Sequence, residues 1–242
     1  MKVLIILQAR MNSSRLPGKI LAPIEGMPAI IYQIRRILPI LNKDIGLVVA
    51  TTNTPKDDEL CTLLDEHSIE FFRGDENDVL DRFVSCSLIH DSEFIIRLNA
   101  DCPLICPRLV KDVMQKMEGT EFDYASTILD ETYPLGMHVE MMRSDLLESI
   151  NKLSLSSEFR EHVTPYIYKN GESYKLLSIV NKRNDSNFRV TVDYPEDLEV
   201  VREIAGYFKE KEFYLEDITD YLHKHPRTVE RNLSFLKSQK LN

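Results

Sequence analysis

Apolar positions follow two different patterns along the first hundred residues. Continuous apolar runs, typical of strands buried on both faces of a parallel sheet, occur at residues 2–7, 46–51, 69–72 and 94–98. Segments whose apolar residues recur at helical spacing lie between these runs, at residues 30–41, 54–67 and 79–89. This alternation predicts βαβ units and therefore an α/β fold around a mostly parallel sheet.

The second half of the chain is less regular. Strand-like segments, with mixed directions, are expected at residues 122–127, 138–142, 174–180 and 188–192. From Glu196 onward the pattern is helical, and the segment from Tyr207 to Asn242 is too polar to form a core by itself. We therefore expect one domain at residues 1–205 and a helical tail at residues 206–242, which packs either on that domain or on the partner of a homodimer.

The charge of the chain limits its partners. Its 242 residues have a formal net charge of -9, whereas nonspecific binding to nucleic acid or to an anionic membrane requires a net basic surface. A solvated helix or a dimer arm explains the cations at residues 227–240 more simply than a nucleic-acid-binding helix. No apolar run approaches the length of a membrane span, and Gln8 and Arg10 interrupt the first run before it could act as a signal sequence. We expect a cytoplasmic protein that binds neither nucleic acid nor membrane.

The polar segment after the first strand holds a cluster of cations. Arg10, Arg15 and Lys19 lie within it, and the first twenty residues contain no acid. Arginine meets phosphate oxygens two at a time and lysine adds a point charge, while Ser13 and Gly18 allow backbone amides to approach a ligand. Because ligands of α/β folds bind at the carboxyl ends of the strands, the segment predicts a polyphosphate site. The alternative is a solvated loop whose cations pair with nearby carboxylates.

Two aspartates follow strand candidates and should face the same edge of the sheet. They are Asp101, in the segment 97–103, and Asp193, in the segment 189–197. Mg²⁺ is commonly held by one or two carboxylates together with phosphate oxygens of the substrate, so this pair predicts a metal site facing the cationic loop. The alternative for Asp193 is a helix N-cap, since Pro195 and two acids follow it.

Five segments together resemble the motifs of the cytidylyltransferases of acidic sugars, in particular the branch of spore-coat polysaccharide synthesis protein F. They are residues 8–19, 97–104, 133–136, 160–165 and 192–198. The resemblance implies a Rossmann-like nucleotidyltransferase fold, related to the glycosyltransferase A architecture, with a mixed, mostly parallel sheet in a three-layer sandwich. It also implies that a CMP-activated or CDP-activated sugar is formed from CTP, with release of pyrophosphate, in surface polysaccharide biosynthesis.

The same resemblance implies roles for individual residues. The triphosphate would be held by Arg10, Ser13, Arg15 and Lys19. Catalysis would depend on Arg10, Lys19 and Asp101, and the ligands of Mg²⁺ would be Asp101 and Asp193. The base, the ribose or another part of the nucleotide would lie near Ala50, Thr52, Arg73 and Asn99. The sugar side would be formed by Gly136, Glu140, Arg160 and His162.

Alternatives stay open at this point. A glycosyltransferase of the same architecture would consume a nucleotide sugar, although such enzymes commonly present Asp-x-Asp to their metal, which this chain lacks. A non-catalytic nucleotide-binding protein would not need the pair of metal ligands. His162 could deprotonate the acceptor, or it could be a helix histidine held by Glu158 or a backbone group. The family usually has Asp where this chain has His138, so the resemblance leaves the acceptor sugar open.

Overall fold

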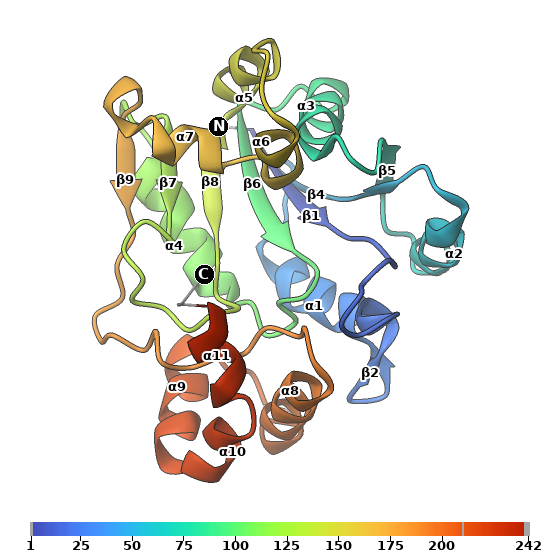
Figure 1. The fold of residues 1–242 in the computed structure, drawn as a ribbon, viewed down its shortest axis with the longest axis vertical. Coiled ribbons are helices and arrows are strands. Elements are labelled where there is room, and N and C mark those ends of the chain that lie inside the picture. Colours follow the sequence, from blue (N-terminus) through green and yellow to red (C-terminus); the bar gives the residue numbers. More distant parts are fainter. Residues whose placement is uncertain (1, 210, 240–242) are drawn as a thin grey trace.

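The computed structural model describes residues 2–209 and 211–239, and it confirms the predicted α/β class (Figure 1). Within these residues the main sheet has the strand order β5-β4-β1-β6-β8-β7-β9. Its strands are β1 (Val3–Gln8), β4 (Ile45–Thr52), β5 (Phe71–Gly74), β6 (Phe94–Asn99), β7 (Tyr124–Ser126), β8 (Glu140–Arg143) and β9 (Leu176–Ser178). β8 is antiparallel to both of its neighbours, and all other neighbouring strands pair in parallel. The sheet is therefore mixed and mostly parallel, as expected.

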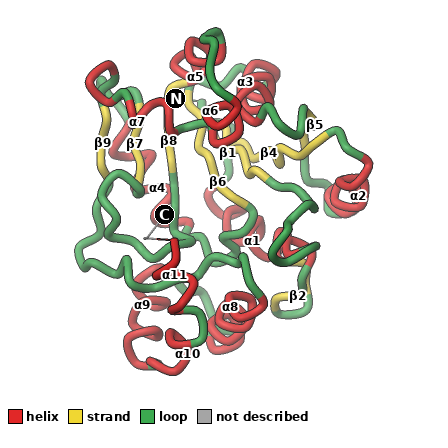
Figure 2. The backbone as a smooth tube through the Cα atoms, viewed as in Figure 1, coloured by secondary structure: helices red, strands yellow, loops and turns green. Residues whose placement is uncertain are grey.

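Helices cover both faces of this sheet and complete three layers (Figure 2). Because successive side chains of a strand point to opposite faces, Ile5 and Leu7 of β1 pack into one apolar cluster, and Leu4 and Ile6 pack into another. The first cluster includes side chains of α1 (Ala29–Ile37), α2 (Asp58–Glu66), α4 (Pro107–Met117), α8 (Pro195–Tyr207) and α9 (Leu215–Lys224). The second includes side chains of α3 (Val79–Ile89), α5 (Ser144–Asn151) and α7 (Pro165–Lys169).

The C-terminal helices pack on the domain that precedes them. After α8 and α9 come α10 (Pro226–Glu230) and α11 (Leu233–Gln239), which lie together at one end of the molecule (Figure 1). Ile218 and Leu222 of α9 are buried in the same cluster as α1. Of the predicted tail, residues 210 and 240–242 lie outside the described residues. No helix in the described part of the chain is long and apolar enough to cross a membrane.

The segment at residues 188–192 is extended but is not the strand that its alternation predicts. Its single β-bridge joins Arg189 to Leu135, and no further ladder extends from it within the described residues. The reason is that its backbone partners are loops: the amide of Val190 donates to the carbonyl of Leu135, and that of Val192 donates to the carbonyl of Asp101, both at 2.7 Å. This segment connects the end of β6 with the loop before β8.

The strand register places three chain positions side by side at the carboxyl edge of the sheet. Gln8 of β1 pairs with Ala50 of β4 on one side and with Asn99 of β6 on the other. The chain proceeds outward from β1 through β4 to β5 and then returns through α3 to β6, so the strand order reverses beside β1. Ligands of α/β folds bind at such reversal points, outside the carboxyl ends of the strands.

Candidate functional site

A polar cavity of about 280 Å³ lies at this reversal point. It is formed by the loop after β1, by residues 99–101 at and after the end of β6, and by Asp193, two residues before α8. The structure brings these predicted site residues into its lining: Arg10, Ser13, Arg15, Lys19, Asn99, Asp101 and Asp193. The cationic loop and both aspartates therefore converge on one site.

The ammonium group of Lys19 joins the two carboxylates. Its Nζ lies 3.0 Å from Oδ2 of Asp101 and 2.8 Å from Oδ1 of Asp193. Burial opposes the charge of Lys19, whose side chain is 13% exposed, but the two carboxylates outweigh that effect and raise its pKa. Lys19 is therefore positively charged at neutral pH, and its ammonium group bridges the two carboxylates.

Asp193 is held much more tightly than Asp101. Its Oδ1 also forms an ion pair with Arg15 at 2.9 Å, and its Oδ2 accepts a hydrogen bond from Arg189 at 3.0 Å. Burial alone would raise the pKa of Asp193, but Lys19, Arg15 and Arg189 outweigh burial and lower it. The side chain of Asp193 is 7% exposed, against 29% for Asp101. Asp193 is thus held by three cations, whereas the side chain of Asp101 is more exposed.

The N-cap alternative for Asp193 does not describe its contacts. The capping carboxylate at the start of α8 is that of Asp197, whose Oδ2 accepts from the backbone amides of Asp193 at 2.9 Å and Tyr194 at 3.0 Å. Asp197 also pairs with Arg189 at 2.7 Å. Since Asp197 supplies the cap, the carboxylate of Asp193 is directed at the cations of the cavity.

The loop after β1 is shaped by one glycine and one buried aspartate. Gly18 has a φ of 70°, in the left-handed region, immediately before the turn that carries Lys19. Asp57, which is 2% exposed, accepts from the backbone amide of Met11 at 2.7 Å and also from the hydroxyl of Thr51 at 3.0 Å. The carboxylate of Asp57 therefore ties the loop to the end of β4.

The residues expected near the base and ribose have structural partners in this structure. Ala50 is buried at the end of β4. Thr52 is also buried, and its hydroxyl bonds to Asp57. Arg73 donates to the carbonyls of Thr52 at 2.9 Å and Thr54 at 2.8 Å and pairs with Asp58. All three belong to the β4 and β5 side of the site and lie outside the lining of the polar cavity.

The residues expected on the sugar side are not brought together in one group. Gly136 has a φ of 108°, and a Cβ there would lie 2.6 Å from the amide nitrogen of Thr191, so this glycine permits a close backbone approach. Glu140 is buried and pairs with Arg97 at 2.5 Å. Arg160 and His162 belong to α6 (Ser157–His162), where Arg160 pairs with Asp78 at 2.7 Å and His162 is exposed.

Sequence reasoning missed the two arginines that organise the site. Arg97 lines the cavity and also donates to Gln8 at 3.2 Å, in addition to its pair with Glu140. Arg189 is buried and joins Asp193 to Asp197. Arg97 opens one of the five motif segments and Arg189 precedes another by three residues, but the partner of each is identified only by the three-dimensional fold. One available signal was that each places a cation in an otherwise apolar, strand-like run.

The donor set suits Mg²⁺ only in combination with a substrate. No group of three or more His, Cys, Asp or Glu side chains forms a metal site within the described residues. The cavity offers two carboxylates that already share one positive group. Hard carboxylate oxygens, few in number and beside a cationic loop, fit an ion that takes its remaining ligands from phosphate and water. The residues present therefore fit Mg²⁺ held jointly with a polyphosphate.

Comparison with known proteins identifies the family of this chain. Residues 4–224 match the family model described as Cytidylyltransferase. The chain belongs to the cytidylyltransferase family. The spore coat polysaccharide biosynthesis protein SpsF of Bacillus subtilis is 33% identical over 83% of this cytidylyltransferase and 85% of its own length. This confirms the predicted relationship to the spore-coat branch.

Solved structures agree with the fold of this cytidylyltransferase. A cytidylyltransferase from Leptospira borgpetersenii serovar Hardjo-bovis superposes with a TM-score of 0.86 at 31% identity and covers 95% of this chain and 97% of its own. The CMP:2-keto-3-deoxy-manno-octonic acid synthetase complexed with CTP superposes with a TM-score of 0.64 at 21% identity and covers 86% and 99% of the two chains. This second likeness concerns the fold alone, and both confirm the nucleotidyltransferase architecture.

Proposed function

We propose that this cytidylyltransferase transfers CMP from CTP to a sugar, releases pyrophosphate and requires Mg²⁺. The observation that carries the proposal is the convergence of Asp101 and Asp193 on the ammonium group of Lys19, in a cavity that Arg10 and Arg15 also line. The relationship to a spore coat polysaccharide biosynthesis protein supports a role in making a surface polysaccharide.

The cations of the cavity would bind the triphosphate and stabilise the departing pyrophosphate. Arg15 and Lys19 now bond to carboxylates, and phosphate oxygens would replace part of these contacts when CTP enters. Arg10 is 43% exposed and lies 4.0 Å from Glu161, so its guanidinium can turn toward a ligand at little cost. Fixed positive groups around a transferring phosphoryl centre lower the barrier because little reorganisation is needed.

The two carboxylates would hold Mg²⁺ together with phosphate oxygens of CTP. The chemistry that bound Mg²⁺ supplies is neutralisation of the charge on the phosphoryl oxygens. Asp193, fixed by Arg15 and Arg189, would define the position of the ion, and the more exposed Asp101 would adjust to it. Lys19 would leave its place between the carboxylates and contact the phosphates.

A thermal-shift series with CTP, UTP, GTP and ATP, each with and without Mg²⁺, tests the proposal. We expect CTP with Mg²⁺ to stabilise the protein selectively, by about 2.7 kcal/mol when the nucleotide is present at a hundred times its dissociation constant. Pyrophosphate release that needs both CTP and a sugar would support transfer. Equal shifts for all four nucleotides, or none, would contradict the proposal.

A further inference from the structure

The C-terminal helices contact the site through Asn232, the residue before α11. Its side chain is buried, and its Nδ2 donates to the backbone carbonyl of Arg189 at 3.1 Å and to Oδ1 of Asp197 at 2.9 Å. Figure 1 shows α11 next to α8, between the other C-terminal helices and the sheet. A segment near the end of the chain therefore bonds directly to the two residues that hold Asp193.

Arg189 and Asp197 fix both the side chain and the backbone of Asp193. Arg189 donates to Oδ2 of Asp193 at 3.0 Å, and Asp197 accepts from the backbone amide of Asp193 at 2.9 Å. Two hydrogen bonds, at 2.7 Å and 2.8 Å, join Arg189 to Asp197. Because a carboxylate has about four acceptor positions, Asn232 can bond to Asp197 beside Arg189, and as a neutral donor it does not compete for the charge. The position of Asp193 thus depends on Asn232 through this buried ion pair.

A second contact of α11 leads to Arg15. The ring of Phe235 stacks on that of Tyr194, with the ring centroids 4.0 Å apart and the planes at 9° to each other. The guanidinium of Arg15 lies over the ring of Tyr194, with Cζ 5.1 Å from the centroid, and forms an ion pair with Asp193. Phe235 therefore supports, through Tyr194, a cation that lines the polar cavity.

Attachment of the C-terminal helices does not account for these contacts, because other residues provide it. Ile218 and Leu222 are buried in the core cluster that includes α1. The hydroxyl of Thr228 donates to Glu203, which belongs to α8 and lies outside the lining of the polar cavity. Burial of an amide side chain costs free energy unless its donors are bonded, so the two directed bonds of Asn232 define a position.

Resting on the proposed transfer from CTP, we propose that Asn232 and Phe235 are positioning residues, which make α11 a part of the active site. Asn232 acts through the buried ion pair and sets where Asp193 meets Mg²⁺. Phe235 acts through the stacked tyrosine and sets where Arg15 meets the triphosphate. Neither is among the described residues that line the polar cavity. Loss of residues that orient a metal ligand commonly lowers metal affinity or activity by about 10- to 100-fold.

A Mg²⁺ titration without any sugar tests the inference. The melting temperature of the full-length protein is followed at saturating CTP while the free Mg²⁺ concentration is raised, and the half-saturating concentration is compared between variants. Asn232→Leu keeps the approximate size of the side chain but removes both of its bonds. We expect the half-saturating Mg²⁺ concentration to rise by about tenfold. An unchanged value would overturn the inference.

A matched control separates positioning from attachment. Thr228→Val removes a buried hydrogen bond between the C-terminal helices and α8. It should lower the melting temperature of the free protein but leave the half-saturating Mg²⁺ concentration at the wild-type value. An equal rise in this variant would show that general loosening of the helices is responsible, and the inference would be wrong.

Phe235→Leu tests the second contact and decides the question if Asn232→Leu does not fold. It keeps an apolar side chain but removes the stacked ring, so the affinity for CTP at saturating Mg²⁺ should fall by about threefold. Wild-type affinity in Phe235→Leu would contradict the inference. Absence of any CTP shift in the wild type would contradict the proposed function instead.

Discussion

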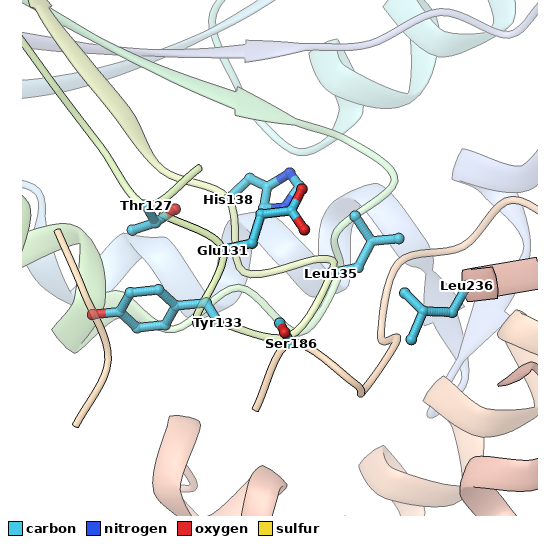
Figure 3. Close-up of a pocket in the computed structure, with 7 residues that line it drawn as sticks. All are labelled: Thr127, Glu131, Tyr133, Leu135, His138, Ser186 and Leu236. Atoms are coloured by element: carbon cyan, nitrogen blue, oxygen red, sulfur yellow. The ribbon is translucent and has the colours of Figure 1, made fainter. Parts of the chain in front are cut away.

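The polar cavity around Lys19, called the phosphate cavity here, differs in construction from a second cavity of about 560 Å³ (Figure 3). The phosphate cavity is formed by one continuous loop and by residues at strand ends, with Lys19, Arg15 and Arg10 facing two aspartates. The second cavity is assembled from loops at residues 127–138 and 186 and from α11, and Glu131 lines it. Side chains at strand ends are held by the sheet, whereas loops tolerate changes of sequence that leave the sheet intact.

The largest expected effect comes from the buried arginine that holds Asp193 at the phosphate cavity. Arg189→Met removes the buried cation between Asp193 and Asp197 and leaves both carboxylates without it. Breaking a buried ion pair by removing one partner costs about 3–5 kcal/mol. We expect the free energy of unfolding, measured with denaturant, to fall by this amount.

The control for that measurement is an exposed pair. Lys116→Met removes the partner of Asp112 on the surface of α4, where both side chains are almost half exposed. Such pairs contribute only about 0.3–0.5 kcal/mol. If the two substitutions cost the same, the pairs of Arg189 with Asp193 and Asp197 do not stabilise the fold more than an exposed pair does.

The next effect concerns the phosphate cavity alone. Asp101→Asn keeps the size of the side chain but removes its charge beside Lys19. Loss of one preorganised electrostatic contact to a transition state lowers kcat by about a hundred- to a thousandfold. We expect this loss in steady-state pyrophosphate release, with unfolding free energy close to that of the wild type.

Asp91→Asn serves as the comparison, because Asp91 is an exposed partner of Lys2 and lies at the opposite end of the strands. It should leave kcat unchanged. A kcat for Asp101→Asn within threefold of the wild-type value (about 0.65 kcal/mol) would show that Asp101 does not act in the reaction.

A smaller effect separates a structural role of Glu140 from a role in sugar binding. Burial opposes its ionisation, but Arg97, Tyr124 and Thr164 outweigh burial and lower its pKa. A carboxyl group whose pKa is lower in the folded state stabilises the protein above its unfolded pKa, and this stability is lost as the pH falls through the folded pKa. Glu140→Gln should therefore cost about 1.5–3 kcal/mol at pH 7, the range for hydrogen bonds to a charged group.

The pH dependence checks this assignment. Denaturation of the wild type and of Glu140→Gln should give free energies that converge as the pH falls below the ordinary carboxyl pKa of about 4.3. A difference that stays constant from pH 7 to pH 3 would mean that the charge of Glu140 is not what stabilises the fold.

The contrast between the cavities also explains what the sequence could predict. The phosphate loop could be predicted because Arg10, Arg15 and Lys19 are close in sequence and follow a strand, whose end has a known orientation in α/β folds. The pair of Arg97 and Glu140 could not, since the two residues lie 43 positions apart and apolar periodicity carries no information on which cation meets which acid. The alternation at residues 188–192 resembles a strand, but its backbone partners are loops that no local pattern identifies.

The second cavity lay beyond sequence reasoning for the same reason. Glu131 and Ser186 are far apart in the chain, and neither stands in a chemically recognisable motif. Arg160 and His162, which the resemblance assigns to the sugar side, lie within the motif segment 160–165, and the structure places them on α6, outside the lining of this cavity. A site made of irregular segments is visible only when the fold has brought them together.

The smallest predicted effect tests whether Arg10, which lines the phosphate cavity, acts on the nucleotide. Arg10 is 43% exposed and its nearest carboxylate is 4.0 Å away, so Arg10→Gln should leave the unfolding free energy unchanged within about 0.5 kcal/mol. The affinity for CTP should fall about tenfold, the equivalent of one partly exposed charge-assisted contact. The affinity difference between wild type and variant should shrink at high salt, because an exposed charge is screened and a buried one is not.

Arg35→Gln, on the exposed face of α1, should have no effect on CTP binding. If Arg10→Gln binds CTP as the wild type does, Arg15 and Lys19 hold the triphosphate without a contribution from Arg10.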